Sequence, residues 1–187
     1  MIKAIITDFD GTLVDTFEAN FKAYQEAFSI VGKTLTKEQY RNCFGFRFER
    51  FMKEMSIYDE MTMNAIKEAK KDAYPNYFEY LRPNKALISL IESFKAMGGR
   101  TAVASTARKE NLMNALNHLD IAKHFDFIYA GIDVKEGKPS PEIYLKTMLT
   151  LDVTPEETMI FEDSQVGVEA ARASKAQYIV VTEEWFK

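Results

Sequence analysis

The fold of this chain is decided by the stretch Ile5-Ile6-Thr7-Asp8-Phe9-Asp10-Gly11-Thr12-Leu13-Val14-Asp15-Thr16. The short apolar run up to Thr7 contains β-branched residues and is typical of a buried strand. In extended backbone, residues i and i+2 point the same way, so Asp8 and Asp10 direct both carboxylates at one spot. Gly11 then lets the chain turn sharply without the penalty of a Cβ atom. Because like charges repel, the pair favours a cation or a proton between them, although a strand followed by a simple acidic turn is the alternative.

The composition indicates a globular chain with a substantial core. Its 187 residues are 47% hydrophobic and 13% aromatic, which suits one domain or a core with a modest insertion. The 24 basic and 28 acidic residues are interspersed and give a formal charge of −4. No basic stripe suggests nucleic acid or an anionic membrane surface as a partner.

The single cysteine, Cys43, excludes an intrachain disulfide and fits a reducing compartment. No nearby histidine supports a catalytic thiol, so we expect Cys43 to pack in the interior. No apolar stretch is long enough to span a bilayer. We therefore expect a soluble, cytoplasmic protein.

The segment from about residue 16 to residue 80 has helical periodicity and no strand. Its first apolar face recurs at spacings of four and three and consists of Phe17, Phe21, Tyr24, Phe28 and Val31. A second helix is predicted from near Thr36, with a break at Gly45, and a third from about residue 59 to residue 73. This segment is predicted to form a small helical bundle.

From Pro83 onward, predicted strands and helices alternate. The strands are expected at residues 101–105, 125–130, 158–161 and 178–181. Such alternation favours a parallel sheet covered on both faces, and right-handed crossovers predict the strand order 3-2-1-4-5. The ends of the first and fourth strands then lie side by side at the switch point, where ligands bind.

Four segments of the chain resemble, in order, the motifs of the haloacid dehalogenase (HAD)-like hydrolase superfamily, in its branch of phosphatases and β-phosphoglucomutases. They are Asp8-Phe9-Asp10-Gly11-Thr12, Val103-Ala104-Ser105-Thr106, Gly137-Lys138-Pro139-Ser140-Pro141-Glu142, and Ile160-Phe161-Glu162-Asp163-Ser164 with Gly167. The resemblance covers residues 1–16 and about 83–182. It implies a Rossmann-like α/β core of residues 1–15 and 81–187, with a helical cap domain of residues 16–80 inserted after the first strand.

The resemblance also implies roles for individual residues. Asp8 would attack phosphorus and form an aspartyl-phosphate, while Asp10 would protonate the leaving alcohol and later activate water. Lys138 would be the third catalytic residue. It precedes a predicted helix start, where the macrodipole disfavours a cation, so it requires a strong anionic partner unless it is an exposed loop lysine. Ser105 would bind a phosphate oxygen through its hydroxyl and through its own and the Thr106 backbone donors.

Mg²⁺ is the cofactor that the resemblance implies. Its ligands would be Asp8, the backbone carbonyl of Asp10, and Asp163, with Glu162 binding directly or through water. Glu162 and Asp163 would crowd Asp8 with like charge, a conflict that a hard dication resolves. The alternative for this acidic pair is a cap at the N-terminus of the helix that begins near Ser164.

Two positions, Asn20 and Lys175, depart from the pattern of the family. Asn20 stands where sugar-phosphate members often carry a histidine, which weakens a mutase interpretation. Lys175 stands where members often have glycine, and a left-handed lysine would cost about 1 kcal/mol, so we expect a turn of a different form. Trp185 and the following Phe186 are expected to pack on the sheet edge.

The leading prediction is a Mg²⁺-dependent phosphatase that acts on a small phosphorylated metabolite, such as a sugar phosphate or a phosphoglycolate-like compound. A sugar phosphomutase and a catalytically silent metabolite-binding module on the same scaffold are the alternatives. Arg47, with Arg50, is the predicted contact of the cap domain to an anionic substrate. We expect a monomer with no nucleic-acid or membrane partner.

Overall fold

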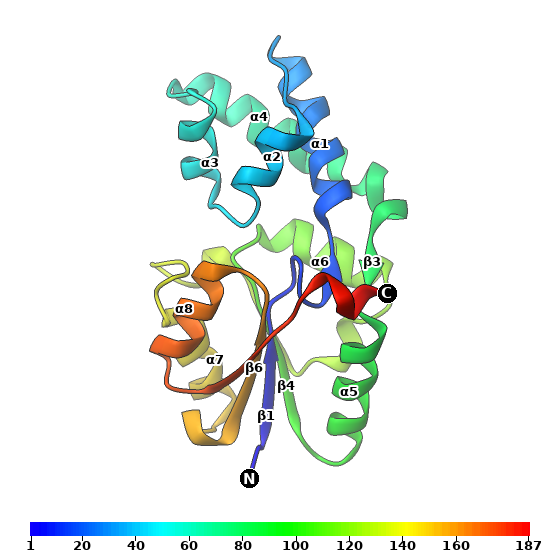
Figure 1. Cartoon of the computed structure of the whole chain (residues 1–187), viewed down its shortest axis with the longest axis vertical. Helices are drawn as coiled ribbons and strands as arrows, with labels where there is room; N and C mark the ends of the chain where they lie inside the picture. Colours follow the sequence, from blue (N-terminus) through cyan, green and yellow to red (C-terminus); the bar gives the residue numbers. More distant parts are fainter. The chain divides into compact units, whose positions relative to one another are not determined.

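Five parallel strands form the central sheet in the computed structural model, which describes residues 1–187 (Figure 1). In sheet order they are β5 (Phe127–Tyr129), β4 (Arg100–Ala104), β1 (Ala4–Thr7), β6 (Thr158–Glu162) and β7 (Gln177–Val180). Numbered along the chain, these strands have the order 3-2-1-4-5. The predicted fold class and strand order are therefore confirmed.

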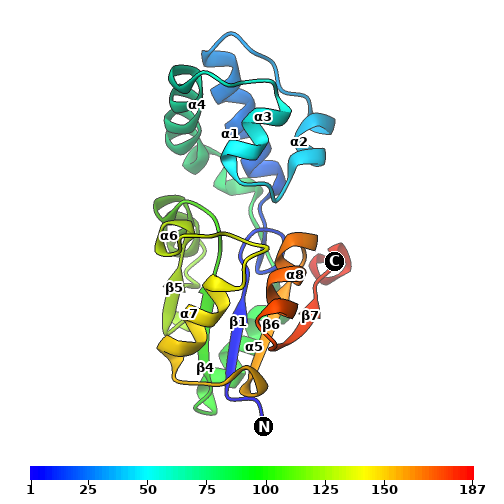
Figure 2. The same ribbon diagram turned by 90° about the vertical axis from the view of Figure 1, so that its left-hand side faces the viewer.

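Helices cover both faces of this sheet, which is why its strands are apolar on both sides. In the register of the sheet, Ile6 of β1 lies between Ala102 and Ile160 of the two neighbouring strands. These three residues share one buried cluster with residues of α7 (Glu142–Leu151) and α8 (Gln165–Ala173). Helix α5 (Lys85–Ala96) lies on the opposite face (Figures 1 and 2).

Shorter elements complete the α/β part of the chain. Helix α6 spans Lys109–His118, and β2 (Val14–Asp15) pairs with β3 (Arg82–Pro83) in an antiparallel ribbon that the sequence did not predict. Strands this short carry too few residues to show a periodicity. The 3₁₀ turns of this part are η2 (Ala122–His124), η3 (Gly131–Asp133), η4 (Pro155–Glu157) and η5 (Glu183–Phe186).

The segment between β2 and β3 is entirely helical. It contains α1 (Phe17–Ile30), α2 (Lys37–Cys43), α3 (Phe48–Glu54), α4 (Glu60–Ala73) and the 3₁₀ segment η1 (Tyr74–Tyr80). Thr36 begins α2 with a capping box to Gln39, and the Asp59 side chain caps α4. Buried aromatic rings dominate its core, in which the Phe51 ring lies 5.7 Å from that of Tyr40 and 5.8 Å from that of Phe28.

The chain separates into two compact units. One, here called the α/β unit, comprises Met1–Asp15 and Arg82–Lys187, and the other, the helical unit, comprises Thr16–Leu81. No helix in either unit combines the length and the apolar character that a membrane crossing requires.

Two expectations about the C-terminal part of the chain are wrong. Lys175 adopts the left-handed conformation, with φ 65°, so the turn keeps its form without glycine. The buried Ser174 explains this, because its hydroxyl donates to the Ala171 carbonyl and accepts from the Ala176 N–H. Trp185 packs against Phe161 of β6, an inner strand, with ring centres 6.1 Å apart.

Candidate active site

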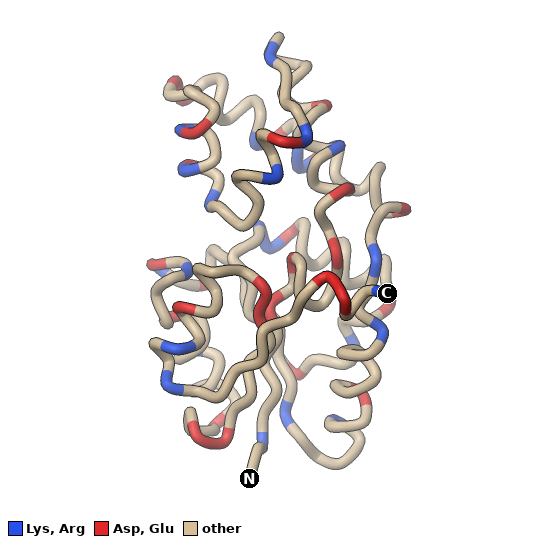
Figure 3. The backbone as a smooth tube through the Cα atoms, viewed as in Figure 1, with Lys and Arg blue, Asp and Glu red and all other residues tan.

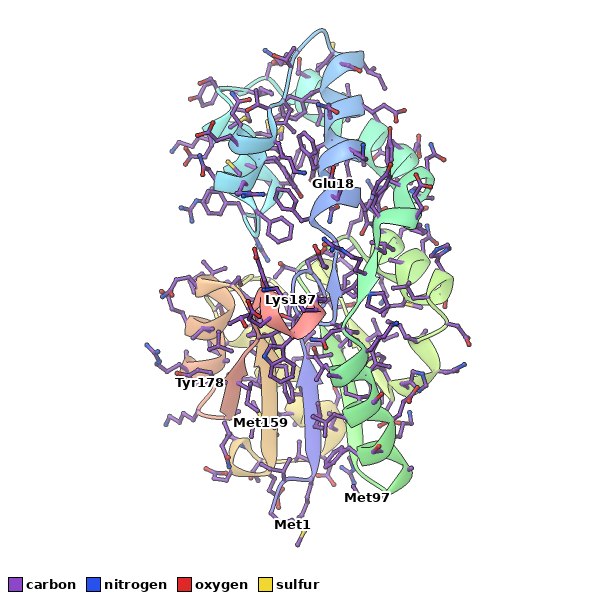
Figure 4. All side chains as sticks on the ribbon, turned by 45° about the vertical axis from the view of Figure 1, so that its right-hand side comes forward. Met1, Glu18, Met97, Met159, Tyr178 and Lys187 are labelled. Atoms are coloured by element: carbon purple, nitrogen blue, oxygen red, sulfur yellow. The ribbon has the colours of Figure 1, made fainter.

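The carboxyl ends of β1 and β6 place Asp8 and Glu162 on one face of the sheet. Side chains alternate along a strand, so Asp8 and Glu162 follow Ile6 and Ile160 onto the face that α7 covers. Their relative exposures are 7% and 0%. Figure 3 shows acidic residues gathered where these strands end, and Figure 4 places Met1 and Met97 at the opposite end of the α/β unit.

Asp163 completes a group of three carboxylates. One oxygen from each of Asp8, Glu162 and Asp163 lies within 4.8 Å of the other two. The hydroxyl of Thr12 donates to Asp163 Oδ1 over 2.7 Å. Gly11 has φ 84°, and a Cβ atom there would stand 2.3 Å from Asp163 Oδ2. Glycine is therefore required at this position by both backbone conformation and space.

Asp10 lies in the tight turn that follows Asp8. The Gly11 N–H donates to the Val14 carbonyl over 2.8 Å and closes this turn. The Asp10 carboxylate is half-buried, and its charge contributes to raising the pKa of both Asp8 and Asp163. It therefore belongs to the same electrostatic neighbourhood as the three clustered carboxylates.

Lys138 is buried beside these carboxylates, with a side chain only 5% exposed. Its ammonium donates to Asp8 Oδ1 over 2.5 Å and to Glu162 Oε1. Burial disfavours the cation, but Asp8, Tyr144 and Glu162 outweigh that cost and raise the lysine pKa well above its usual value. The alternative of an exposed loop lysine is therefore wrong.

The Glu162 carboxylate is held by donors on both oxygens. Oε1 accepts from Lys138 and, over 2.6 Å, from the Tyr144 hydroxyl. Oε2 accepts from the Asp163 N–H over 3.0 Å and from the N–H and hydroxyl of Ser164, each over 3.3 Å. A Cβ atom on Gly167 would lie 2.0 Å from this carboxylate, so glycine leaves the space that Glu162 occupies.

The N-terminus of α8 is capped by serine. The Ser164 hydroxyl accepts from the Gly167 N–H over 3.1 Å, while the Asp163 carboxylate accepts from Thr12. Asp163 therefore does not serve as the helix cap that was the alternative for the acidic pair. Its carboxylate belongs to the cluster with Asp8.

The cluster carries more negative charge than Lys138 can balance. Burial raises the pKa of Asp8 well above its usual value although Lys138 opposes the shift. Burial also raises the pKa of Asp163 to about 6, against the hydrogen bond from Thr12. Buried carboxylate oxygens with uncompensated charge are the donor set that a hard divalent cation prefers. The residues present therefore fit a hard divalent metal ion.

The predicted phosphate-binding residues follow β4. The Ser105 N–H donates to the Tyr129 carbonyl over 3.1 Å, so this backbone donor is used within the sheet, contrary to expectation. The Ser105 hydroxyl accepts from the Ala107 N–H over 3.0 Å and keeps its own proton to donate. A Cβ atom on Gly131 would lie 2.6 Å from the Thr106 carbonyl oxygen, so the loop containing Thr106 packs closely on the segment after β5.

Two further residues complete the comparison with the sequence. Arg47 is exposed at the residue before α3 and belongs to the helical unit, so its contact with substrate stays a prediction. Tyr144 was missed in the sequence analysis. Hydrophobic periodicity indicates that this aromatic residue is buried in a helix, but it does not reveal that the hydroxyl bonds to a residue of the site. The position of Tyr144 six residues after Lys138 was the available signal, since a helix begins between them.

The model of the haloacid dehalogenase-like hydrolase family matches residues 5–181. The chain belongs to this family. It is 32% identical over 182 residues to a phosphorylated carbohydrates phosphatase of Thermotoga maritima. The aligned region covers 95% of this chain and 84% of the relative. It is 30% identical to the protein CbbY of Rhodobacter capsulatus, with 98% and 87% of the two chains covered.

Solved structures of relatives agree with this assignment. CbbY from Rhodobacter sphaeroides in complex with phosphate superposes with a TM-score of 0.86 at 31% identity, over 100% of this chain and 89% of that one. A β-phosphoglucomutase from Clostridium difficile has a TM-score of 0.84 at 26% identity, over 100% and 87% of the respective chains. These superpositions confirm the HAD-like fold. The match to the family model and the relatives named as phosphatases show that the chain is a phosphoester hydrolase.

Proposed function

We propose that this protein is a Mg²⁺-dependent phosphatase that hydrolyses a small phosphorylated metabolite through an aspartyl-phosphate on Asp8. The observation that carries the proposal is the group formed by the buried Asp8 and Glu162 with the half-buried Asp163, in which Lys138 is bonded to Asp8 and Glu162. A phosphate monoester resists attack because its oxygens are anionic, so its hydrolysis requires cations beside an aligned nucleophile. Asp8 beside Lys138 supplies this combination.

The proposed reaction proceeds in two displacements. A carboxylate oxygen of Asp8 attacks phosphorus, the bond to the ester oxygen breaks, and Asp10 gives a proton to the departing alcohol. Asp10 then takes a proton from a water molecule that attacks phosphorus, which releases inorganic phosphate and restores Asp8. The Lys138 ammonium balances the charge of Asp8 and of the phosphoryl oxygens, and the Ser105 hydroxyl with Thr106 binds one of those oxygens.

Asp8, Asp163 and the Asp10 carbonyl would hold Mg²⁺, with Glu162 binding directly or through water. Bound there, the ion would keep Asp8 ionised and offset the charge of the phosphoryl group. Magnesium takes few carboxylates together with water and phosphate oxygens, which suits this small set of ligands.

The proposed substrates are phosphorylated sugars or phosphoglycolate-like acids. Relatives are named as phosphatases of phosphorylated carbohydrates and of fructose 1-phosphate, and CbbY has been solved with xylulose-(1,5)bisphosphate. A phosphoglycolate phosphatase of Aquifex aeolicus is 27% identical. In this proposal the helical unit determines which of these compounds is the substrate, and Arg47 is the residue of that unit that contacts the anionic substrate. The cytoplasmic location and the monomeric state stay predictions.

Turnover of p-nitrophenyl phosphate with and without metal tests the proposal. EDTA is expected to abolish hydrolysis and Mg²⁺ to restore it, whereas Ca²⁺ is expected to fail. Calcium accepts higher coordination, which lets Asp8 bind it through both oxygens and occupies the attacking lone pair. Full activity in chelator would refute the metal assignment, and no release of phosphate across a panel of metabolite phosphates would favour a silent binding module.

A sugar phosphomutase is the second candidate, favoured by the similarity to the Clostridium difficile β-phosphoglucomutase. A mutase protects its phosphorylated aspartate from water and requires a bisphosphate activator. Asn20, buried in α1, stands where sugar-phosphate members of the family often carry a histidine, which weakens the mutase interpretation. We expect release of phosphate without any bisphosphate, and faster isomerisation of glucose 1-phosphate than hydrolysis of any monoester would reverse the choice.

A further inference from the structure

Tyr144 is a fully buried polar side chain to which the proposed reaction assigns no role. It lies on α7 with 0% exposure, and its hydroxyl donates to Glu162 Oε1 over 2.6 Å. The Lys138 ammonium stands 5.1 Å from the centre of its ring. One side chain thus contacts both the acceptor and the cation of the buried ion pair.

These contacts limit how the Glu162 carboxylate can turn. Oε2 is anchored by the backbone N–H groups of Asp163 and Ser164, at the start of α8. Oε1 is shared by the Tyr144 hydroxyl and the Lys138 ammonium. Because donors hold both oxygens, the carboxylate is restrained in the plane in which it meets Lys138, and Lys138 is thereby directed at Asp8.

Packing alone does not account for a tyrosine at this position. The buried face of α7 joins an apolar cluster with residues such as Ile143 and Met148, and a phenylalanine ring would fill the same volume. A phenol hydroxyl buried without a partner is costly, so its value here lies in the bond to Glu162.

We propose that Tyr144 is a positioning residue, whose hydroxyl fixes Glu162 so that Lys138 is held against Asp8. Its effect on turnover rests on the proposed phosphatase function. The hydroxyl touches neither the nucleophile nor the reacting phosphoryl group, so it acts through Glu162 and Lys138. Loss of the hydroxyl leaves Lys138 as the side-chain donor on Oε1, which frees that oxygen to draw the ammonium away from Asp8.

The chain offers a closely matched control in Tyr129. Its hydroxyl shares a hydrogen bond of 2.7 Å with Thr150 of the same helix α7, and Lys146 stands 5.2 Å from the centre of its ring. Tyr129→Phe and Tyr144→Phe therefore delete the same atom, each with a hydrogen-bond partner and a lysine near the ring, although Tyr129 is only partly buried and its partner is neutral. They differ in whether the partner of the hydroxyl belongs to the ion pair.

Steady-state kinetics of the two Mg²⁺-loaded variants with p-nitrophenyl phosphate provide the first test. Tyr144→Phe is expected to lower kcat about tenfold while KM changes less than about twofold, since binding groups remain but the cation is misplaced. Tyr129→Phe is expected to keep both constants. Equal kcat values for the two variants would overturn the proposal, as would a Tyr144→Phe defect confined to KM.

Urea unfolding of a double-mutant cycle tests the contact without requiring turnover. Tyr144→Phe is expected to raise the unfolding equilibrium constant about tenfold in the wild-type background and much less in the Glu162→Gln background. Tyr129→Phe is expected to have the same effect in both. Additive effects of Tyr144→Phe and Glu162→Gln would overturn the proposal even in an active enzyme. If the wild-type protein hydrolyses no phosphate ester, the proposed function fails, and this cycle alone decides whether Tyr144 fixes Glu162.

Discussion

The two units of the chain place cations beside aromatic rings in opposite environments. In the helical unit, the exposed Arg50 stands 3.7 Å from the centre of the Phe46 ring. In the α/β unit, Lys138 stands beside the Tyr144 ring but is buried and bonded to carboxylates. An exposed cation on a ring contributes about 0.5–1 kcal/mol, whereas an unpaired buried charge costs several.

The two interiors also differ in what they bury. Aromatic and aliphatic side chains make up the core of the helical unit, and such a core tolerates changes that keep its volume. The α/β unit buries like charges within 4.8 Å of one another at the ends of β1 and β6. That arrangement lowers stability and is typical of a functional site. The chemistry is therefore expected to depend on the α/β unit, and the helical unit to affect only which substrates bind.

The largest effects are expected from substitutions that test whether catalysis depends on the α/β unit and substrate binding on the helical unit. Asp8→Asn removes the nucleophile, so turnover should fall below detection with every substrate. Arg47→Ala in the helical unit should raise KM for the physiological substrate while leaving kcat within a few-fold. Steady-state kinetics of both variants check this expectation. A loss of kcat in Arg47→Ala as complete as in Asp8→Asn would refute the claim that the helical unit affects only substrate binding.

Asp10→Asn separates the two steps of the reaction. Loss of a general acid–base costs a factor of about 10²–10⁴, but p-nitrophenol hardly needs a proton as it leaves. A burst of nitrophenol followed by slow turnover is therefore expected, with one added phosphoryl group detectable by mass spectrometry. The matched Asp8→Asn protein should carry none. Phosphoryl trapping on Asp8→Asn would mean that the two roles are reversed.

Lys138→Met compared with Arg50→Ala tests the environments of the two cations. Lys138→Met leaves the buried Asp8 and Glu162 without their cation and is expected to lower the free energy of unfolding by about 3–5 kcal/mol. Arg50→Ala should lower it by less than about 1 kcal/mol. Urea unfolding in chelator measures both values. Similar losses in the two variants would show that the burial of Lys138 does not make its contacts contribute more to stability than those of the exposed Arg50.

Asp163→Asn is expected to stabilise the metal-free protein. The pKa of Asp163 is raised to about 6, so between its unfolded value and pH 6 the folded state binds more protons and stability falls as pH rises. The substitution removes this loss, with an expected gain of about 1–3 kcal/mol at pH 7.5 and none at pH 4. Urea unfolding at these two pH values, in chelator, measures the gain. A gain at pH 4 equal to that at pH 7.5 would rule out the carboxylate charge as its source.

The smallest effects are expected from relief of backbone strain. Replacing a residue of positive φ by glycine should change the stability of the protein by a similar amount in the two units. Lys175 in the α/β unit and Ser56 in the helical unit both have positive φ, at 65° and 54°. Lys175→Gly and Ser56→Gly are each expected to stabilise the protein by up to about 1 kcal/mol, because glycine adopts this conformation without a Cβ clash. Thermal unfolding measures both, and destabilisation of either variant by glycine would show that its side-chain contacts outweigh the strain.

The sequence by itself determined the sheet and the identity of the charged residues at its switch point. Alternating strand and helix patterns, with right-handed crossovers, predicted a parallel sheet of order 3-2-1-4-5, and that order is observed. Asp8 and Asp163 could be expected to meet because β1 and β6 are neighbours whose carboxyl ends share an edge. These inferences depend on local periodicity and on chain direction, both of which are readable from a single sequence.

Only the tertiary structure decided how the polar atoms are paired. Lys138 and Asp8 are 130 residues apart in the chain, and the bond between them depends on how the loop before α7 meets the end of β1. The Tyr144 hydroxyl, the two anchored oxygens of Glu162 and the engaged N–H of Ser105 depend likewise on packing. A hydrogen bond is sensitive to tenths of an ångström and to angle, whereas hydrophobic periodicity specifies only which face of an element is buried.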